Sequence, residues 1–289
     1  MYRTAKSILS VVTVGLMTLG LLTGSAAAAP IIQLDDSNSH AEFDLDDPNS
    51  HHEEFPAGTS AGLYQWKVDQ VNRMFQEWFW FRVGNTAAER PVADLSRTFT
   101  RWSDVSEYAG NDVLSLKYAE VDPGTPESFM IEVIFTLMGG PTGSGQSDMA
   151  ETIKITNTGT TPLDMHFFEY TNFDISASDT ITFPNANTVV QSGAGGMVAE
   201  TVVTPSPSHR QAGLASAILG SLTDATATTL TDNAGAGPGD LAWVYEWERT
   251  IPAGDSLIIS KDKNIVPEPA TMVLMAGGLM MSLVLRRKR

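Results

Sequence analysis

The sequence predicts an all-β protein: an antiparallel, jelly-roll-like β-sandwich with a signal helix at its N-terminus and a single transmembrane helix at its C-terminus. Between residues 59 and 263, short segments rich in β-branched and aromatic residues recur along the chain. Turn-forming sequences such as GGPTGSG, NTGTTP and NAGAGPGD separate these segments. Strands that follow one another without regular intervening helices indicate an antiparallel sandwich rather than a parallel α/β sheet.

Composition excludes several classes of protein. The 289-residue chain is 42% hydrophobic, which is too apolar for a wholly disordered protein. It has no cysteine, so a disulfide framework, a thiol nucleophile, an iron–sulfur cluster and a cysteine-ligated zinc site are all excluded. Acidic residues outnumber lysine and arginine 34 to 18, for a net charge of −16. Because nucleic-acid binding needs a basic surface, we expect no nucleic-acid partner.

Residues 1–28 have the three parts of a secretory signal peptide. Arg3 and Lys6 form the positive region, Ile8–Leu22 is the apolar stretch, and small residues with an A-x-A pattern end at Ala28. An uncleaved membrane anchor is the alternative. The short apolar core and the alanine run favour cleavage after Ala28, and therefore export through the secretion machinery.

Residues 29–58 form an acidic, histidine-containing segment with an internal duplication. The stretch Asp35–His40 recurs eleven residues later as Asp46–His51. Its carboxylates and imidazoles could bind a divalent cation weakly, and calcium is the conceivable ion. The spacing matches neither a calcium-binding loop nor an HExxH motif. We therefore predict a solvated, self-repelling linker and no bound metal or cofactor.

The body, residues 59–263, contains the predicted strands. One segment between them, residues 209–222, is compatible with a helix or a short helical connection. The strands are expected at residues 75–83, 113–121, 129–138, 152–156, 163–173, 187–191, 197–204, 241–251 and 256–260.

The segment Leu163–Asp174 contains the candidate ligand face. With a period of two, one face of this strand is mainly apolar and the other mixes aromatic rings with polar groups. Such a mixed face can bind a sugar, because rings stack on it while polar groups bind its hydroxyls. The alternative is a partly exposed sheet face whose rings cover neighbouring strands. The candidate face consists of His166, Phe168, Tyr170, Asn172 and Asp174.

Two further aromatic rows occur at strand spacing: Trp78 with Trp80, and Trp243 with Tyr245 and Trp247. Either row could be a carbohydrate platform, but large rings at this spacing are more typical of the core between two sheets.

No catalytic motif is found. Glu246 and Glu248 alternate with the second aromatic row and are expected on a wet outer face. Two carboxylates on one strand do not flank a glycosidic bond from opposite sides, and nothing in the sequence pairs them with Glu77 or Glu169. The glycine-rich stretch at residues 139–145 lacks the ending of a phosphate-binding loop. We predict that the protein is not an enzyme.

The C-terminal segment, residues 264–289, has three ordered features. Pro267, Glu268 and Pro269 form an extended tripeptide, because each proline disfavours helix at the preceding residue. An apolar stretch follows and is expected to form a transmembrane helix at residues 270–285. Its central run of about 15 apolar residues makes a helix roughly 23 Å long, which is shorter than the hydrocarbon layer of a bilayer at roughly 30 Å. The chain ends with the basic residues Arg286, Arg287, Lys288 and Arg289, which hold this end in the cytoplasm.

These features together resemble the PEP-CTERM sorting signal of exported proteins from Gram-negative bacteria. The resemblance implies recognition by an exosortase, an integral-membrane cysteine transpeptidase, in cells that make extracellular polysaccharide and biofilm matrix. A plain membrane anchor is the alternative. The implied route is export, transient anchoring in the inner membrane with the body in the periplasm, and then release to the cell surface or the medium.

Three functions are therefore considered for the body. The first is a structural or adhesive role in the cell envelope or matrix, and the second is a carbohydrate-binding module acting on exopolysaccharide. The third is a glycan-active enzyme that uses a carboxylate such as Glu169.

Overall fold

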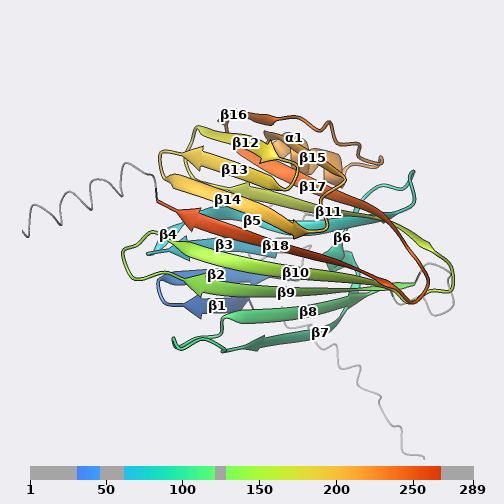
Figure 1. The fold of residues 1–289 in the computed structure, drawn as a ribbon, viewed down its shortest axis with the longest axis horizontal. Coiled ribbons are helices and arrows are strands. Elements are labelled where there is room, and N and C mark those ends of the chain that lie inside the picture. Colours follow the sequence, from blue (N-terminus) through green and yellow to red (C-terminus); the bar gives the residue numbers. More distant parts are fainter. Residues whose placement is uncertain (1–30, 46–61, 121–127, 268–289) are drawn as a thin grey trace, which may run out of the picture.

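The computed structural model describes residues 31–45, 62–120 and 128–267, which form two β-sheets packed face to face (Figure 1). The prediction of an all-β antiparallel sandwich is confirmed. The expected signal helix and the expected helix at 270–285 lie outside the described residues. Within the described ranges, no helix is long and apolar enough to cross a membrane.

The first sheet, called sheet A here, has nine strands, of which the central ones are β5, β11 and β17. Its neighbouring strands are antiparallel except for a short parallel contact between β3 and β5. Its main order is β1 (Ile32–Asp36), β2 (Ser39–Asp44), β3 (Gly62–Val68), β5 (Met74–Val83), β11 (Leu163–Phe173), β17 (Leu241–Ile251) and β15 (His209–Leu214), with β4 (Val71–Asn72) on β3 and β6 (Arg90–Pro91) on β5.

The second sheet, sheet B, also has nine strands, and all its pairings are antiparallel. Its order is β16 (Gly235–Gly239), β12 (Asp179–Asn185), β13 (Thr188–Gly193), β14 (Gly196–Thr204), β18 (Ser256–Val266), β10 (Ser147–Asn157), β9 (Phe129–Gly139), β8 (Val113–Ala119) and β7 (Ser96–Ser103). The helices among the described residues are α1 (Ala215–Thr223) and the 3-10 turn η1 (Val92–Asp94). These broad sheets, in which strands adjacent in sequence mostly pair, differ from the jelly-roll order that we expected.

Aromatic side chains fill the space between the sheets. Phe79 of β5 stacks on Phe135 of β9 and on Phe167 of β11, with ring centroids 6.1 and 5.5 Å apart. Trp243 of β17 stacks on Phe173 at 5.7 Å, so the second aromatic row lies in this core as predicted. Alternate residues of a strand point to opposite faces, so Trp80 does not share the face of Phe79.

Trp80 is buried, but on the face of sheet A that points away from sheet B. It lies opposite Phe168 in the strand register and packs edge-to-face against Tyr170, with the centroids 5.9 Å apart. Helix α1 covers this outer face, and Tyr170 Oη donates a hydrogen bond to the carbonyl of Ala215 at the start of α1. The expectation that Trp80 belongs to the core between the sheets is therefore wrong.

The linker predicted at residues 29–58 is wrong for residues 32–44, which form the hairpin β1–β2 at the edge of sheet A. Between its acidic residues the segment buries alternate apolar side chains, among them Leu34 and Phe43. Phe43 packs on Phe135 with the centroids 4.8 Å apart. The second copy of the duplication, residues 46–51, lies outside the described residues. At the other end, β18 continues to Val266, beyond the predicted boundary at 263.

Candidate functional site

Strand β11 lies between β5 and β17 in sheet A, and its bounds match the predicted strand. Its even-numbered residues face outward, as the period of two predicts. However, Phe168 and Tyr170 are almost fully buried beneath the outer layer of the domain, so the face is not an open platform. The five candidate residues separate into His166 at one end, Asn172 with Asp174 at the other, and two buried rings between them.

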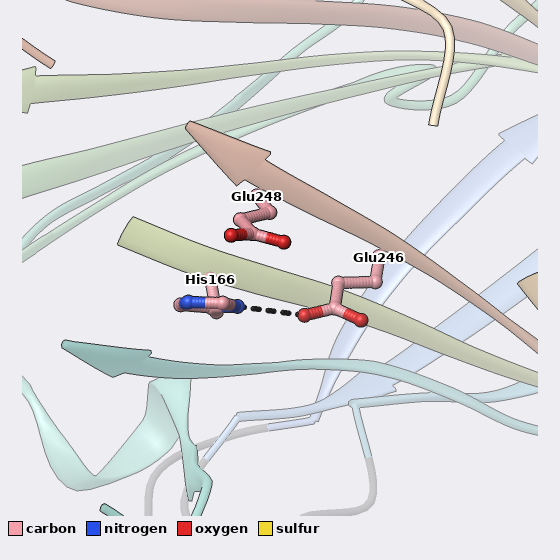
Figure 2. A group of neighbouring side chains, drawn as sticks. All are labelled: His166, Glu246 and Glu248. Carbon is pink, nitrogen blue, oxygen red and sulfur yellow. Dashed lines mark hydrogen bonds and ion pairs between the residues drawn. The ribbon is translucent and has the colours of Figure 1, made fainter. Parts of the chain in front are cut away.

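His166 belongs to a buried polar cluster (Figure 2). Its Nδ1 lies 2.7 Å from Glu246 Oε1 on β17, and its Nε2 lies 3.0 Å from Asn85 Oδ1. Glu248 also neighbours His166, because the two residues are directly paired in the register of β11 and β17. Both ring nitrogens of the histidine are thus engaged within the protein.

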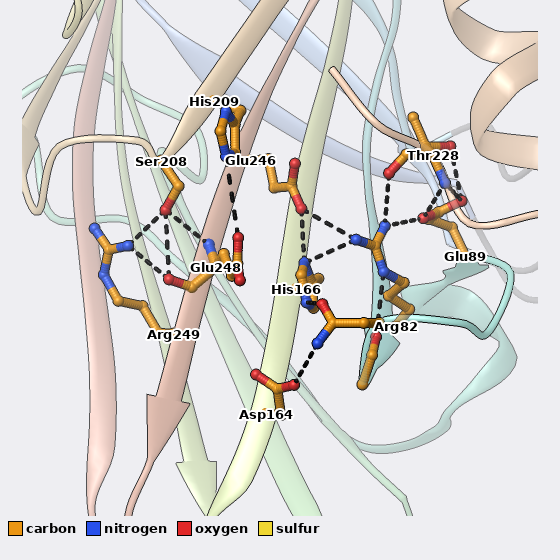
Figure 3. A network of polar contacts seen from close by, with 12 residues as sticks. Arg82, Glu89, Asp164, His166, Ser208, His209, Thr228, Glu246, Glu248 and Arg249 are labelled. Atoms are coloured by element: carbon orange, nitrogen blue, oxygen red, sulfur yellow. Dashed lines mark hydrogen bonds and ion pairs between the residues drawn. The ribbon is translucent and has the colours of Figure 1, made fainter. Parts of the chain in front are cut away.

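Arg82 of β5 completes the cluster from the other side (Figure 3). Its Nη2 lies 2.9 Å from His166 Nδ1 and 3.5 Å from Glu246 Oε1. Its Nη1 forms an ion pair with Glu89 and donates to the carbonyl of Thr228 at 3.0 Å. Arg82 and Glu89 were not predicted from the sequence, although a charged residue directly after the apolar run 78–81 was a usable signal for Arg82.

The solvent side of the cluster is formed by Glu248 and His209, whose side chains are 46% and 41% exposed. His209 Nδ1 lies 2.7 Å from Asp232 Oδ2, and this hydrogen bond raises the pKa of His209 above its usual value. Ser208 Oγ accepts hydrogen bonds from the backbone N–H of Glu248 at 3.0 Å and from Arg249 Nη1 at 2.5 Å. These groups could receive a polar ligand, whereas His166 and Glu246 are covered.

A metal ion does not fit this cluster. The ligand atoms of His166, Glu246 and Glu248 lie within 4.8 Å of one another, which is a suitable spacing. However, the Arg82 guanidinium lies against both His166 and Glu246, where it supplies the positive charge that a metal would bring. A second cation at this distance would be repelled.

A cavity of about 260 Å³ opens at the other end of the candidate face. The ring of Phe75, the amide of Asn172 and the carboxyl groups of Asp174 and Asp240 line it, together with Phe173, Ser176, Ala177 and Asp179. Asp179 is already held by Gln191 Nε2 at 2.6 Å and by Ser176 Oγ at 2.7 Å. Asp174 and Asp240 are exposed. The cavity therefore combines a ring with planar polar groups.

The other two glutamates considered as catalytic partners lie in the interior. Glu77 and Glu169 are fully buried between the sheets, where they pair with Lys261 and Lys263. Glu246 lies on the opposite face of sheet A from Glu169, because it is paired with the adjacent residue Phe168. No substrate can contact Glu246 and Glu169 together without crossing the sheet.

Residues 266–289 match the PEP-CTERM protein-sorting motif. The chain therefore carries an exosortase sorting signal. The resemblance based on Pro267–Pro269 and Arg286–Arg289 is thus confirmed, although Glu268 and everything after it lie outside the described residues. No curated protein sequence matches the chain.

Among solved structures, the body is similar to a galactose mutarotase related enzyme from Lactobacillus acidophilus, with a TM-score of 0.48, 6% identity and coverage of 82% of this chain and 97% of that one. It is also similar to a putative aldose 1-epimerase from Escherichia coli K12, with a TM-score of 0.47, 9% identity and coverage of 83% and 99%. Similarity at this level transfers neither an activity nor a site residue to this chain.

Proposed function

We propose that this exosortase-sorted protein is exported to the cell surface or the extracellular matrix, where its sandwich acts as an adhesive domain that binds a sugar of the surrounding polysaccharide. The finding that supports the binding role is the cavity of about 260 Å³ beside Asn172 and Asp174. The domain binds its ligand without converting it.

The lining of the cavity suits a hydroxyl-rich ligand. Asp174 and Asp240 offer carboxylate oxygens and Asn172 an amide, which together can accept and donate hydrogen bonds to sugar hydroxyls. Phe75 supplies an apolar ring against which the apolar face of a sugar can pack. The carboxylates, in a chain with a net charge of −16, would repel an anionic glycan. The preferred ligand is therefore a neutral sugar or an amino sugar.

Two measurements test this proposal. The first is retention of the purified exported protein on columns of neutral polysaccharide, and the second is calorimetry with the glycan that retains it. We expect Asp174→Asn to weaken binding about tenfold or more, because a hydrogen bond to a charged group contributes roughly 1.5–3 kcal/mol. Asp255→Asn is the matched control, since Asp255 is exposed in the β17–β18 turn, away from the cavity lining. Equal affinity of both variants, or no retention on any neutral glycan, would contradict the binding role.

A glycan-active enzyme is the second candidate, favoured by the contact of 2.7 Å between His166 and Glu246. A histidine–carboxylate pair can hold and relay a proton, and Glu248, which is 46% exposed and paired with His166 in the strand register, is the group of this cluster that a sugar can contact. This candidate predicts turnover of a glycan that Glu246→Gln or Glu248→Gln abolishes, whereas Asp174→Asn, at the opposite end of the face, leaves kcat and KM unchanged. If no glycan is converted by the wild-type protein, the binding role remains.

A further inference from the structure

Six ionisable side chains meet in the interior between the two sheets. Sheet A contributes two glutamates, from β5 and β11, and sheet B contributes two glutamates and two lysines, from β10, β14 and β18. None is more than 1% exposed. The group, called the interior cluster here, consists of Glu77, Glu169, Glu151, Glu200, Lys261 and Lys263.

Lys263 lies at the centre of close contacts in this cluster. Its Nζ is 2.6 Å from Glu77 Oε1, 2.5 Å from Glu151 Oε1 and 2.7 Å from Glu169 Oε1. Lys261 Nζ contacts Glu151 and Glu169 and lies 3.2 Å from Glu77 Oε1. Because Glu77 and Glu169 belong to sheet A and both lysines to sheet B, these contacts join the two sheets.

The cluster is not balanced as a set of ion pairs. Four carboxyl groups face two ammonium groups, and burying an unpaired charge in such an interior is costly. Three carboxyl oxygens of the interior cluster have no hydrogen-bond partner among the described residues: Glu77 Oε2, Glu169 Oε2 and Glu200 Oε1. The arrangement therefore leaves acid groups that the ammonium groups do not satisfy.

A metal ion does not resolve the imbalance. Glu77, Glu151 and Glu169 place ligand atoms within 4.8 Å of one another. The Nζ atoms of Lys261 and Lys263 already contact all three residues, so they take the place of a bound cation. A divalent ion in the same space would be repelled by two ammonium groups.

Protonation of a carboxyl group does reduce the imbalance between the four carboxyl groups and the two ammonium groups. Burial, and then the charge of Glu151, raise the pKa of Glu77 well above its usual value, which favours the neutral carboxylic acid. Burial alone would raise the pKa of Glu169 as well, but Lys261 and Lys263 lower it below its usual value, so Glu169 is a carboxylate. Lys263 thus contacts a neutral carboxylic acid and a carboxylate at the same time.

We propose that Lys263 and Glu77 condense to an intramolecular isopeptide bond that links β18 to β5. Although burial alone would lower the pKa of Lys263, the surrounding carboxylates raise it, and the two lysines lower that of Glu169, so the ammonium–carboxylate pair is the resting state. Across the contact of 2.7 Å the Glu169 carboxylate transiently accepts a proton from the Lys263 ammonium, and the freed Nζ attacks Glu77 Cδ. The new bond is Nζ–Cδ, and the bond that breaks joins Cδ to the Glu77 hydroxyl. That hydroxyl leaves as water with one of the two protons that Nζ gives up, and the other proton stays on Glu169. The step needs no oxidant and no co-reactant.

Three physical features favour this step. The reacting groups are held in contact by two packed sheets, which replaces an encounter in solution by a fixed geometry. The product converts a buried ammonium and a buried carboxylate into neutral groups, which removes a desolvation cost. The site is sealed, since Glu77 and Lys263 are fully buried, so water for the reverse reaction has no direct access. The bond would staple the two sheets covalently in a chain that has no cysteine.

Peptide mass spectrometry tests the proposal. The mature protein, which retains Glu77 and Lys263, is taken from the host that exports it and is denatured before digestion. We expect a crosslinked peptide that joins the segments of Lys263 and Glu77 and is lighter than the two linear peptides together by one water. Lys263→Arg and Glu169→Gln should each abolish the crosslink; Lys154→Arg, at a half-exposed lysine of β10, is the matched control and should keep it.

The wild-type digest decides the question even if a cluster variant fails to fold. Recovery of Lys263 and Glu77 only in separate linear peptides would overturn the proposal and leave the cluster purely ionic. A crosslink from a lysine to a different glutamate would overturn the assignment of this pair.

Discussion

Glu200 of β14 shows how the interior changes the chemistry of one residue. It is fully buried, and its Oε2 accepts a hydrogen bond of 3.0 Å from Trp243 Nε1. Burial, followed by the charge of Glu169, raises the pKa of Glu200 from its ordinary value of 4.5 to about 8. Between these two values the folded protein keeps a proton that the unfolded chain releases.

This proton predicts how stability depends on pH. The folded state binds more protons than the unfolded state, so the free energy of unfolding falls as the pH rises from 5 to 8, by up to about 1.4 kcal/mol per pH unit for one proton. Urea unfolding at several pH values measures this slope. Glu200→Gln should make it shallower, while the contributions of Glu77 and His209, whose raised pKa values act in the same direction, remain. A free energy of unfolding that increases over this range would contradict the assignment.

At the scale of one element, the hairpin β1–β2 is part of the fold rather than an appendage. Its turn is tied to sheet B, because Asp36 Oδ2 accepts a hydrogen bond from the Gly139 N–H at 2.7 Å and Asn38 Oδ1 accepts one from the Gly140 N–H at 2.8 Å. Phe43 contributes its ring to the core beside Phe135.

We therefore expect Phe43→Ala to destabilise the protein by about 3–5 kcal/mol, as is typical for removing a buried ring. Val105→Ala is the control, since Val105 is 68% exposed, and its effect should stay within about 0.5 kcal/mol. Denaturant unfolding of both variants gives the comparison. A Phe43→Ala protein as stable as the control would restore the linker interpretation.

The elements differ in how far the sequence could predict them. The bounds of β11 and β17 follow from long alternation of rings and polar residues. The strands β1 and β2 were missed because acidic residues hide their apolar alternation. The end of β18 was missed because Lys261 and Lys263 look like solvent-facing residues. Their partners lie on strands far away in the sequence, and no local pattern reveals such a pairing.

The candidate site shows the same limit. The outward direction of His166 follows from the period of two, and so does the direction of Glu246. The contact between them depends on the register of β11 against β17, which the sequence does not specify. The cover over Phe168 and Tyr170 depends on how α1 packs, so a face with the composition of a ligand platform is closed for much of its length.

At the scale of the whole molecule, two groups within the described ranges have the spacing of a metal site, and each contains its own cation: Arg82 in one, Lys261 and Lys263 in the other. Stability should therefore not depend on a divalent ion. We expect the same thermal midpoint in EDTA and in millimolar calcium, measured by calorimetry at constant ionic strength. A lower midpoint in EDTA would show that the described residues, or the segment at 46–61, bind a metal.

The ends of the fold also predict the form of the mature protein. The first strand begins at Ile32, shortly after the expected cleavage at Ala28, and the last strand ends at Val266, where the sorting motif begins. Cleavage at both places therefore removes no described strand, and the sandwich keeps its core.

We expect the mature protein to lack Met1–Ala28 and the residues beyond Pro267–Pro269, because the PEP-CTERM motif at residues 266–289 is a signal for processing by an exosortase. Intact-mass measurement of protein from the native host, with the isopeptide water loss taken into account, gives both new ends. Glu268→Ala should leave the C-terminal segment attached, whereas Asp255→Asn should be processed normally. Wild-type protein that still carries Arg286–Arg289 after export would instead indicate a permanent membrane anchor.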